Sequence, residues 1–392
     1  MRLAVLLAMA ALAAPAAVND SDFRWERVVA SPASGHVTFE PDGALYAHSR
    51  AGLADLRVLD ARGRQVPWRR LPDPGPRAVK EVELLNAGRQ GRAFLGLLDL
   101  GPTRTVRNRA ELVIEAERDY VGRVTVFGSD DRQRFTRLST TTVFDLRGAS
   151  TATSTRLIFP PTDHRFLRLR GVGVPLPVAA RVYNEPRRPS HRRVPARTTL
   201  AQLERMTHVR LDLGFAKRPV DVLRFTTATR RFDRSLVVSG SNQRRLFTVL
   251  HRGRIVRLGG VTQLQVPVEG RHRRISVVVE NGDDEPLRGL RVEALARPRA
   301  VVLAKGSESP YRVLYGNPAL SAPQYDFAQL PARELEPLTA GTLGGERENP
   351  GWEPPGDTRS FLERNPGLVE VALALVALSL GVGGFFALRR RA

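Results

Sequence analysis

The chain has 392 residues, 42% of them hydrophobic, which is enough for two or three domains that each bury a core. It contains no cysteine, which excludes disulfides, thiolate metal sites and thiol catalysis. The net charge is +21, and every basic residue except Lys80, Lys217 and Lys305 is arginine. Such a charge favours anionic partners. The preference for arginine over lysine, however, is also what genome composition alone produces, without selection for a ligand.

Residues 1–17 read MRLAVLLAMAALAAPAA, the pattern of a secretory signal peptide. Arg2 forms a positively charged n-region, and the apolar run Leu3–Ala13 is too short to span a bilayer. Ala14-Pro15-Ala16 fits the small-x-small cleavage pattern. We therefore expect export from the cytoplasm, and no nucleic-acid partner.

Residues 18–92 are predicted to form an N-terminal β domain. Leu56–Val58 and Val66–Trp68 are short strand-like runs, and the segment 60–63 between them (DARG) is typical of a turn. Because Trp68 ends an alternating strand, we expect it in the core.

An internal repeat organises the middle of the chain. The tetrapeptide LDLG occurs at 98–101 and again at 211–214. The segment 124–138, VTVFGSDDRQRFTRL, corresponds in the same way to 236–250, LVVSGSNQRRLFTVL. Alternating apolar residues followed by Gly-Ser predict a strand and a tight turn in each copy. We expect two hairpins in two separate sandwiches, with Phe135 and Phe247 returning to the core.

The repeat sets the predicted domain boundaries. The first jelly-roll repeat is placed at 93–185, a linker at 186–198 and the second repeat at 199–298. Long helical periodicity is nearly absent, and Thr199–Met206 (TLAQLERM) is the one short helix candidate. The expected fold class is therefore all-β, a tandem β-sandwich ectodomain.

The C-terminal part is predicted to lead into a membrane. Further strands are expected at 299–335, and a juxtamembrane stalk without a core at 336–366. Residues 367–388 are apolar enough for one transmembrane helix, with Glu370 as its single charge. The tail 389–392 carries three arginines, which indicates the cytoplasmic side. We expect a single-pass protein of the bacterial inner membrane, its ectodomain in the periplasm or outside the cell.

The predicted membrane helix carries a stripe of small residues. Ser379, Gly383 and Ala387 recur every four residues and so share one helix face. Small residues let a second helix approach closely in lipid. This face is therefore a candidate packing surface for a polytopic membrane partner, although small residues are also common in simple anchors.

Two resemblances follow from these motifs. The LDLG strand, followed by the Gly-Ser hairpin with its returning Phe, resembles galactose-binding-like jelly rolls of the discoidin type. The segments ADLRVLDARGRQVPW (54–68) and PYRVLYGN (310–317), together with the repeat and the terminal helix, resemble the bacterial family called domain of unknown function 3999. The first resemblance implies ligands on loops away from the hairpin. The second implies a polytopic membrane partner and no particular activity.

No catalytic or metal-binding motif is evident. None of the seven histidines lies two or four residues from another, so short-spaced ligand motifs fail. Asp130 and Asp131 are adjacent in a turn, and the second repeat has Asn242 and Gln243 there, which favours a solvated turn over a glycosidase pair. We expect no cofactor.

The linker provides the candidate ligand contact. Arg187, Arg188, Arg192 and Arg193 form a dense cationic group that could bind an anionic polysaccharide or lipid headgroups; a solvated linker is the alternative. The favoured function is a non-enzymatic, membrane-tethered binding or scaffold protein of the envelope. Two alternatives stay open: an enzyme that hydrolyses or modifies envelope polysaccharide, and a purely structural assembly subunit.

Overall fold

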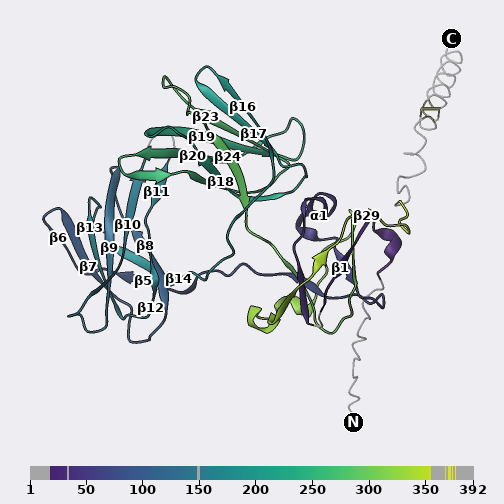
Figure 1. The fold of residues 1–392 in the computed structure, drawn as a ribbon, viewed down its shortest axis with the longest axis horizontal. Coiled ribbons are helices and arrows are strands. Elements are labelled where there is room, and N and C mark those ends of the chain that lie inside the picture. The colour runs from purple at the N-terminus through teal and green to yellow at the C-terminus, as the bar shows by residue number, and fades with distance from the viewer. Residues whose placement is uncertain are drawn as a thin grey trace, which may run out of the picture.

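The computed structural model describes residues 18–32, 35–147 and 151–354, together with Gly367, Glu370, Val371, Leu373 and Val376. These residues form two β-sandwiches and a third β domain built from both ends of the described chain (Figure 1). We call the third body the terminal domain (18–72 and 299–354), and the others the first sandwich (77–184) and the second sandwich (192–296). The prediction of an all-β fold is confirmed.

The two sandwiches have the same strand order. In each, a six-stranded sheet packs on a four-stranded sheet, and both sheets contribute to one core. The six-stranded sheets run β6-β7-β13-β9-β10-β11 and β16-β17-β23-β19-β20-β21. The four-stranded sheets run β5-β14-β8-β12 and β15-β24-β18-β22. The repeat seen in the sequence is therefore a duplication of a complete ten-stranded sandwich.

The strands of the first sandwich are β5 (Arg77–Glu83), β6 (Leu85–Gln90), β7 (Ala93–Asp99), β8 (Arg107–Val113), β9 (Tyr120–Ser129), β10 (Thr136–Leu146), β11 (Ala152–Ser154), β12 (Arg156–Thr162), β13 (Phe166–Val172) and β14 (Ala179–Asn184). Those of the second are β15 (Arg192–Arg193), β16 (Arg197–Leu203), β17 (Met206–Asp212), β18 (Pro219–Thr226), β19 (Phe232–Ser241), β20 (Thr248–Leu258), β21 (Val261–Gln263), β22 (Gln265–Arg271), β23 (Arg274–Glu280) and β24 (Arg291–Ala296).

The predicted hairpins are present in both copies. β9 pairs with β10 and β19 with β20, each antiparallel and each with one register shift. Val124 and Val126 in one copy, and Leu236 and Val238 in the other, are buried on the inner face of their sheet. Alternation of apolar and polar residues fixes this register, because a slip of one residue would move these side chains to solvent.

The terminal domain joins segments that are far apart in sequence. Its five-stranded sheet runs β28-β1-β26-β3 with β29 on β1, and its four-stranded sheet runs β27-β2-β25-β4. Trp25 thus pairs with Tyr315. As predicted, Trp68 is buried in the shared core. The strands are β1 (Trp25–Ala30), β2 (His36–Phe39), β3 (Arg57–Leu59), β4 (Trp68–Arg70), β25 (Val301–Leu303), β26 (Tyr311–Tyr315), β27 (Leu338–Ala340), β28 (Thr342–Leu343) and β29 (Arg347–Glu348).

The helices are short. Four 3-10 turns span Asp20–Asp22, Ala51–Leu53, Asp326–Gln329 and Ala332–Leu335. The one α-helix within residues 18–354 is α1 (Gly43–His48), where Asp42 accepts a hydrogen bond from the Leu45 amide at 3.0 Å as N-cap.

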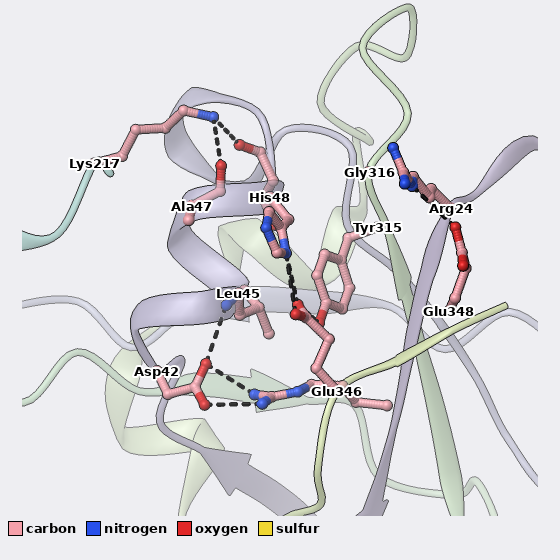
Figure 2. Close-up of polar contacts among 12 residues, drawn as sticks. Arg24, Asp42, Leu45, Ala47, His48, Lys217, Tyr315, Gly316, Glu346 and Glu348 are labelled. Atoms are coloured by element: carbon pink, nitrogen blue, oxygen red, sulfur yellow. Dashed lines mark hydrogen bonds and ion pairs between the residues drawn. The ribbon is translucent and has the colours of Figure 1, made fainter. Parts of the chain in front are cut away.

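Helix α1 connects the terminal domain to the second sandwich. Lys217 of the second sandwich donates from its Nζ to the Ala47 carbonyl at 3.1 Å, as Figure 2 shows. It also donates to the Ser49 carbonyl at 2.5 Å. A lysine at these carbonyls satisfies the free acceptors of a helix C-terminus. On the other side of α1, Glu346 lies between His48 Nδ1 (3.0 Å) and the Tyr315 hydroxyl (2.6 Å).

Several predicted boundaries are wrong. The strands β5 and β6 lie before residue 93 but belong to the first sandwich, and Arg192–Arg193, placed in the linker, form strand β15 on β24. The predicted strands 299–335 share one core with the N-terminal strands. The stalk assignment fails for 338–352, because Leu343 packs on that core and buried Asn349 donates to the Phe23 carbonyl at 2.9 Å.

The predicted helix Thr199–Met206 is also wrong. Residues 197–203 form β16, and β17 begins at Met206. Glu204 adopts a positive φ of 40°, which turns the chain between the two strands. The leucine spacing fits one helix turn, but the β-branched Thr198 and Thr199 favour a strand, and β17 supplies a continuous ladder of seven residue pairs.

The predicted signal peptide and most of the predicted membrane segment lie outside the residues that the structure describes. Residues 1–17 and the small-residue face Ser379, Gly383 and Ala387 lie outside the described residues. Five residues of the predicted span 367–388 are described, all helical. Within the described part of the chain, no helix has the length and apolar character needed to cross a membrane.

Candidate functional site

The linker arginines do not converge on one open surface. Arg188 lies 3.6 Å from Asp73, Arg192 lies 3.0 Å from Glu40, and Arg193 lies 3.7 Å from Glu293. Arg187 is exposed and forms no ion pair with a carboxylate in the described part of the chain. Three of the four therefore pair within the protein: Arg192 connects the second sandwich to the terminal domain, Arg193 pairs inside the second sandwich, and Arg188 pairs with the segment that follows the terminal domain.

A cleft of about 950 Å³ lies where the chain crosses between the terminal domain and the second sandwich. Arg188 and Arg192 line it, but so do Asp73, Asp221 and Glu269. Arg299 is already bound to Asp221. This balance of charge makes the cleft a poor match for a strongly anionic ligand.

A smaller pocket on the second sandwich has a different character. It holds about 360 Å³ and is formed by β16, β17, β23 and the tip of the β19–β20 hairpin. Its lining consists of Arg197, Thr199, Arg210, Leu211, Asp212, Arg244, Phe247, Arg274 and Ile275. We call it the Phe247 pocket.

Strand register brings these side chains together. Arg197 on β16 lies opposite Asp212 on β17, which in turn lies opposite Arg274 on β23. Thr199 lies opposite Arg210 in the same way. Directly opposed residues place their side chains on the same sheet face, so three strands contribute polar groups to one patch.

The pocket has an excess of positive charge. Asp212 is its one carboxylate and is paired with Arg274 at 3.4 Å and with Arg273 at 3.5 Å. Arg197, Arg210 and Arg244 are exposed and form no ion pair with any carboxylate that the structure describes. Three guanidinium groups are therefore available to an external anion, and each can bind a carboxylate or phosphate through two hydrogen bonds.

Phe247 supplies an exposed aromatic surface. Its side chain is 42% exposed, so the prediction that it returns to the core is wrong. Its counterpart Phe135 is half-buried, and there the Arg168 guanidinium lies 3.9 Å from the ring centroid. The returning aromatic thus ends on the outer face of the sheet in both copies.

The two sandwiches differ in what covers this aromatic. In the first, Arg168 lies opposite Phe127 on the neighbouring strand and contacts both Phe127 and Phe135. In the second, Ser276 and Ser239 occupy the positions of Arg168 and Phe127. Short serines leave Phe247 uncovered. A comparison of the two repeats in the sequence alone would show this exchange, once the strands are aligned.

Polar residues also replace apolar ones around the pocket. Register places Arg210 where the first sandwich has Leu97, and Arg274 where it has Phe166. The hairpin arginine is common to both copies, but in the first sandwich Arg132 is bound to Asp99 at 3.3 Å. The cationic pocket is therefore specific to the second sandwich.

The adjacent carboxylates Asp130 and Asp131 of the β9–β10 turn accept hydrogen bonds that hold the turn and its neighbours in place. Asp131 accepts hydrogen bonds from the Gln133 and Arg134 amides at 2.8 Å, and Asp130 accepts from the Arg165 amide and His164. Backbone hydrogen bonds are the main cause that lowers the pKa of both carboxyls. Both stay ionised, which is unsuited to a general acid.

The histidines do not form a metal site within the described residues, where no group of three His, Asp or Glu side chains has metal-binding geometry. His164 and His272 instead pack over Gly128 and Gly240, where an added Cβ would lie 2.2 and 2.6 Å from the imidazole ring. This explains the glycine of each Gly-Ser turn.

Comparisons with known proteins find no matching family model and no matching curated protein. Among solved structures, a glycoside hydrolase 29 family member from an unknown rumen bacterium is 11% identical, with a TM-score of 0.21 over 53% of this chain and 40% of that one. A fucolectin from striped bass (Morone saxatilis) serum is 10% identical, with a TM-score of 0.18 over 59% of this chain and 86% of that one.

A third structure contains the CBM32-1, CBM32-2 and M60 catalytic domains of Clostridium perfringens ZmpB. It is 8% identical, with a TM-score of 0.21 over 65% of this chain and 41% of that one. The chain thus spans about 40% of the length of the glycoside hydrolase and ZmpB structures. TM-scores this low do not bear on ligand or activity.

Proposed function

We propose that this protein is a non-enzymatic binding protein of the bacterial envelope whose second sandwich binds an anionic glycan. The observation that carries the proposal is the Phe247 pocket, in which three unpaired arginines surround one exposed aromatic ring. A sugar ring can pack its apolar face on a phenylalanine while its carboxylate or phosphate binds the guanidinium groups. Few but well-placed polar groups around an apolar surface are typical of ligand sites.

The alternative of a polysaccharide hydrolase is less well supported. A glycosidase needs two carboxyl groups that flank the substrate, one of them with a raised pKa. In the Phe247 pocket the single carboxylate, Asp212, is held by two arginines. At the β9–β10 turn, Asp130 and Asp131 are both held ionised.

Membrane tethering is part of the proposal. Residues 1–17 would direct export, and residues 367–388 would anchor the chain, with Ser379, Gly383 and Ala387 packed against a polytopic partner. The fastening of 338–354 to β1 and β2 supports a membrane-proximal terminal domain, because only a short segment separates Pro354 from the proposed helix. The sandwiches would then extend the glycan site away from the bilayer.

Binding can be tested with polygalacturonate as the acidic probe and dextran as the uncharged control. We expect the full-length protein in detergent to bind polygalacturonate alone, and more weakly as salt rises, since the Debye length shortens to about 8 Å at physiological ionic strength. Arg244→Ser should weaken binding about tenfold, which corresponds to about 1.4 kcal/mol. Phe247→Ala should weaken it similarly at unchanged net charge.

Arg187→Ser is the matched control, because it removes one exposed, unpaired arginine outside the pocket. It should leave the affinity within about twofold if the Phe247 pocket is the site. Equal losses for Arg187→Ser and Arg244→Ser would indicate general attraction to the net charge. Absence of binding at low salt would contradict the proposal.

A further inference from the structure

The edge strands of the two sandwiches differ in how they are protected against pairing with another strand. A sheet edge exposes unpaired backbone N–H and C=O groups, and proteins normally protect such edges with prolines, bulges, charges, short strands or a covering element. The strand orders define eight edges: β5, β6, β11, β12, β15, β16, β21 and β22. Seven of them show at least one of these protections.

The protections are of several kinds. β12 contains Pro160 and Pro161, and β22 contains Pro267; both also have register shifts. β5 has a register shift and four charged residues. β15 has only two residues. β11 and β21 have three residues each, and Ala152 and Val261 on these strands are buried together where the two sandwiches meet.

β16 shows none of these protections. All seven of its residues are exposed, and it pairs with β17 through a continuous register without a bulge. It has no proline, and its only charge is Arg197 at the start of the strand. Two of its side chains, Leu200 and Leu203, are apolar and 43% and 57% exposed. A regular strand of this length, with a single charge at its first residue, is a template for pairing with another strand.

The first sandwich provides an internal comparison. Its equivalent edge, β6, is also fully exposed, but its register shifts between Leu85 and Gly88, and Asn86 has a positive φ of 49°. The bulge interrupts the row of backbone groups. Of two copies of the same sandwich, one has a protected edge and the other an open one. Figure 1 places β16 at the outer rim of the second sandwich, away from the other two domains.

We propose that β16 pairs antiparallel with β16 of a second copy of this chain, forming a two-fold symmetric dimer through a continuous sheet. A two-fold interface uses the same surface on both subunits, and β16 suits this because its charge lies at one end. A pairing centred on Leu200 places Arg197 opposite Leu203 of the other copy and Thr199 opposite Ala201. No like charges then face each other, and the apolar side chains at the centre cover one another.

The dimer would also bring two Phe247 pockets together. Arg197 and Thr199 lie on β16 and line that pocket, so the dimer axis runs beside it. The pairing itself depends only on the strand edge and is independent of the proposed ligand. The pairing of β16 with β16 leaves no free β16 edge on either copy, so assembly through this edge stops at two subunits.

Cysteine substitution tests the pairing, because the natural chain has none. Directly opposed residues of antiparallel strands have Cα atoms about 4.5–5.5 Å apart, within disulfide range. Thr199→Cys, Leu200→Cys and Ala201→Cys should be made singly in the full-length protein in detergent and oxidised. We expect Leu200→Cys, which lies opposite itself in this pairing, to form the most disulfide dimer on a non-reducing gel, and Thr199→Cys and Ala201→Cys to form less.

Arg89→Cys on β6 is the matched control, since it places a thiol on the equivalent exposed strand of the first sandwich. It should stay monomeric. Adding Ala201→Pro to Leu200→Cys should abolish the cross-link, because proline removes a ladder donor, while circular dichroism confirms the fold. Cross-linking no stronger than that of Arg89→Cys at all three positions, or undiminished by Ala201→Pro, would overturn the proposal.

Discussion

The repeated LDLG motif has a physical cause at the level of single residues. Asp99 and Asp212 end equivalent strands, and each accepts a hydrogen bond at 2.9 Å from the amide of the glycine two residues later. Those glycines, Gly101 and Gly214, have φ values of 86° and 81°, which other residues rarely adopt. The aspartate fixes the turn and the glycine permits it, so both copies of the sandwich retain the pair.

Asp99 gives the first residue-scale prediction, a pH-dependent contribution to stability. Its hydrogen bonds with Arg165, both 3.0 Å, are the main cause that lowers its pKa from 3.8 to about 2. A carboxyl whose pKa falls on folding stabilises the native state above its unfolded pKa, and this contribution disappears as the pH falls from about 4 toward 2.

Asp99→Asn should therefore lower the free energy of unfolding by about 1–2 kcal/mol at pH 7, less than a fully buried pair because the carboxylate is partly solvated. Urea unfolding from pH 7 to pH 2 should show the difference from wild type narrowing below pH 4. Asp212→Asn is the control; its arginine contacts are longer, at 3.4 and 3.5 Å, so its loss should be smaller. A difference that does not change with pH would contradict the argument.

At the scale of elements, α1 determines how the terminal domain meets the second sandwich. Lys217 binds carbonyls at its C-terminal end, and Phe215 lies against Gly43 at its start, where an added Cβ would be 2.4 Å from the ring. The equivalent residue in the first sandwich, Arg104, pairs instead with Asp130 and Asp163 of its own domain. One position in the duplicated sandwich has therefore acquired an interdomain role in the second copy.

Lys217→Met should loosen this contact without unfolding either domain. It removes two hydrogen bonds from a charged donor but keeps most of the side-chain volume, and the expected loss of interdomain free energy is about 1–3 kcal/mol. Hydrogen exchange of the α1 amides should become faster. Arg104→Met should leave exchange in α1 unchanged, and an equal response to both variants would show that Lys217 has no special role.

Elements that depend on local pattern could be predicted from the sequence, whereas those that depend on distant partners could not. The β9–β10 and β19–β20 hairpins can be predicted from the alternation of apolar and polar residues and from the Gly-Ser turn that follows it. The terminal domain depends on pairings between distant residues, such as Trp25 with Tyr315, which no local sequence pattern predicts. The segment Thr199–Met206 is predicted as a helix, but its leucine spacing fits a strand equally well, and only the pairing of β16 with β17 decides between the two structures.

The candidate site was harder to predict for the same reason. The linker arginines are dense in sequence, but the fold supplies Asp73, Glu40 and Glu293 as their partners. The Phe247 pocket is assembled from four separate segments, and its arginines are unpaired only because of how those segments meet. Charge density along a sequence therefore shows where cations are, and the fold decides which of them stay free.

At the scale of the whole molecule, the chain leaves the terminal domain, forms both sandwiches and returns. The β1–β26 and β2–β25 pairings close this path by joining residues from the two ends. The sandwiches also contact one another through an apolar cluster of Phe144, Ala152, Val256 and Val261. The chain thus forms a closed circuit: it passes from the terminal domain to the first sandwich, then to the second sandwich, and back to the terminal domain. The linker between the sandwiches is one of these three interdomain connections.

This circuit predicts that cutting the linker will not separate the halves. A protease recognition sequence inserted between the exposed Pro189 and Ser190 would yield one fragment with the N-terminal strands and the first sandwich, and a second with the second sandwich and the C-terminal strands. The terminal domain needs both fragments, because its two sheets each take strands from both.

We expect the cleaved protein to elute as one species in size-exclusion chromatography, with unchanged circular dichroism, and to separate only in denaturant. Burial of the shared core drives this association, since Val29, Val37, Val301 and Val313 are all at most 1% exposed and come from both fragments. Val313→Asp, which places a charge in that core, should let the fragments separate after cleavage. Separation of the wild-type fragments in native buffer would show instead that each half folds alone and that the terminal domain contributes little to holding the chain together.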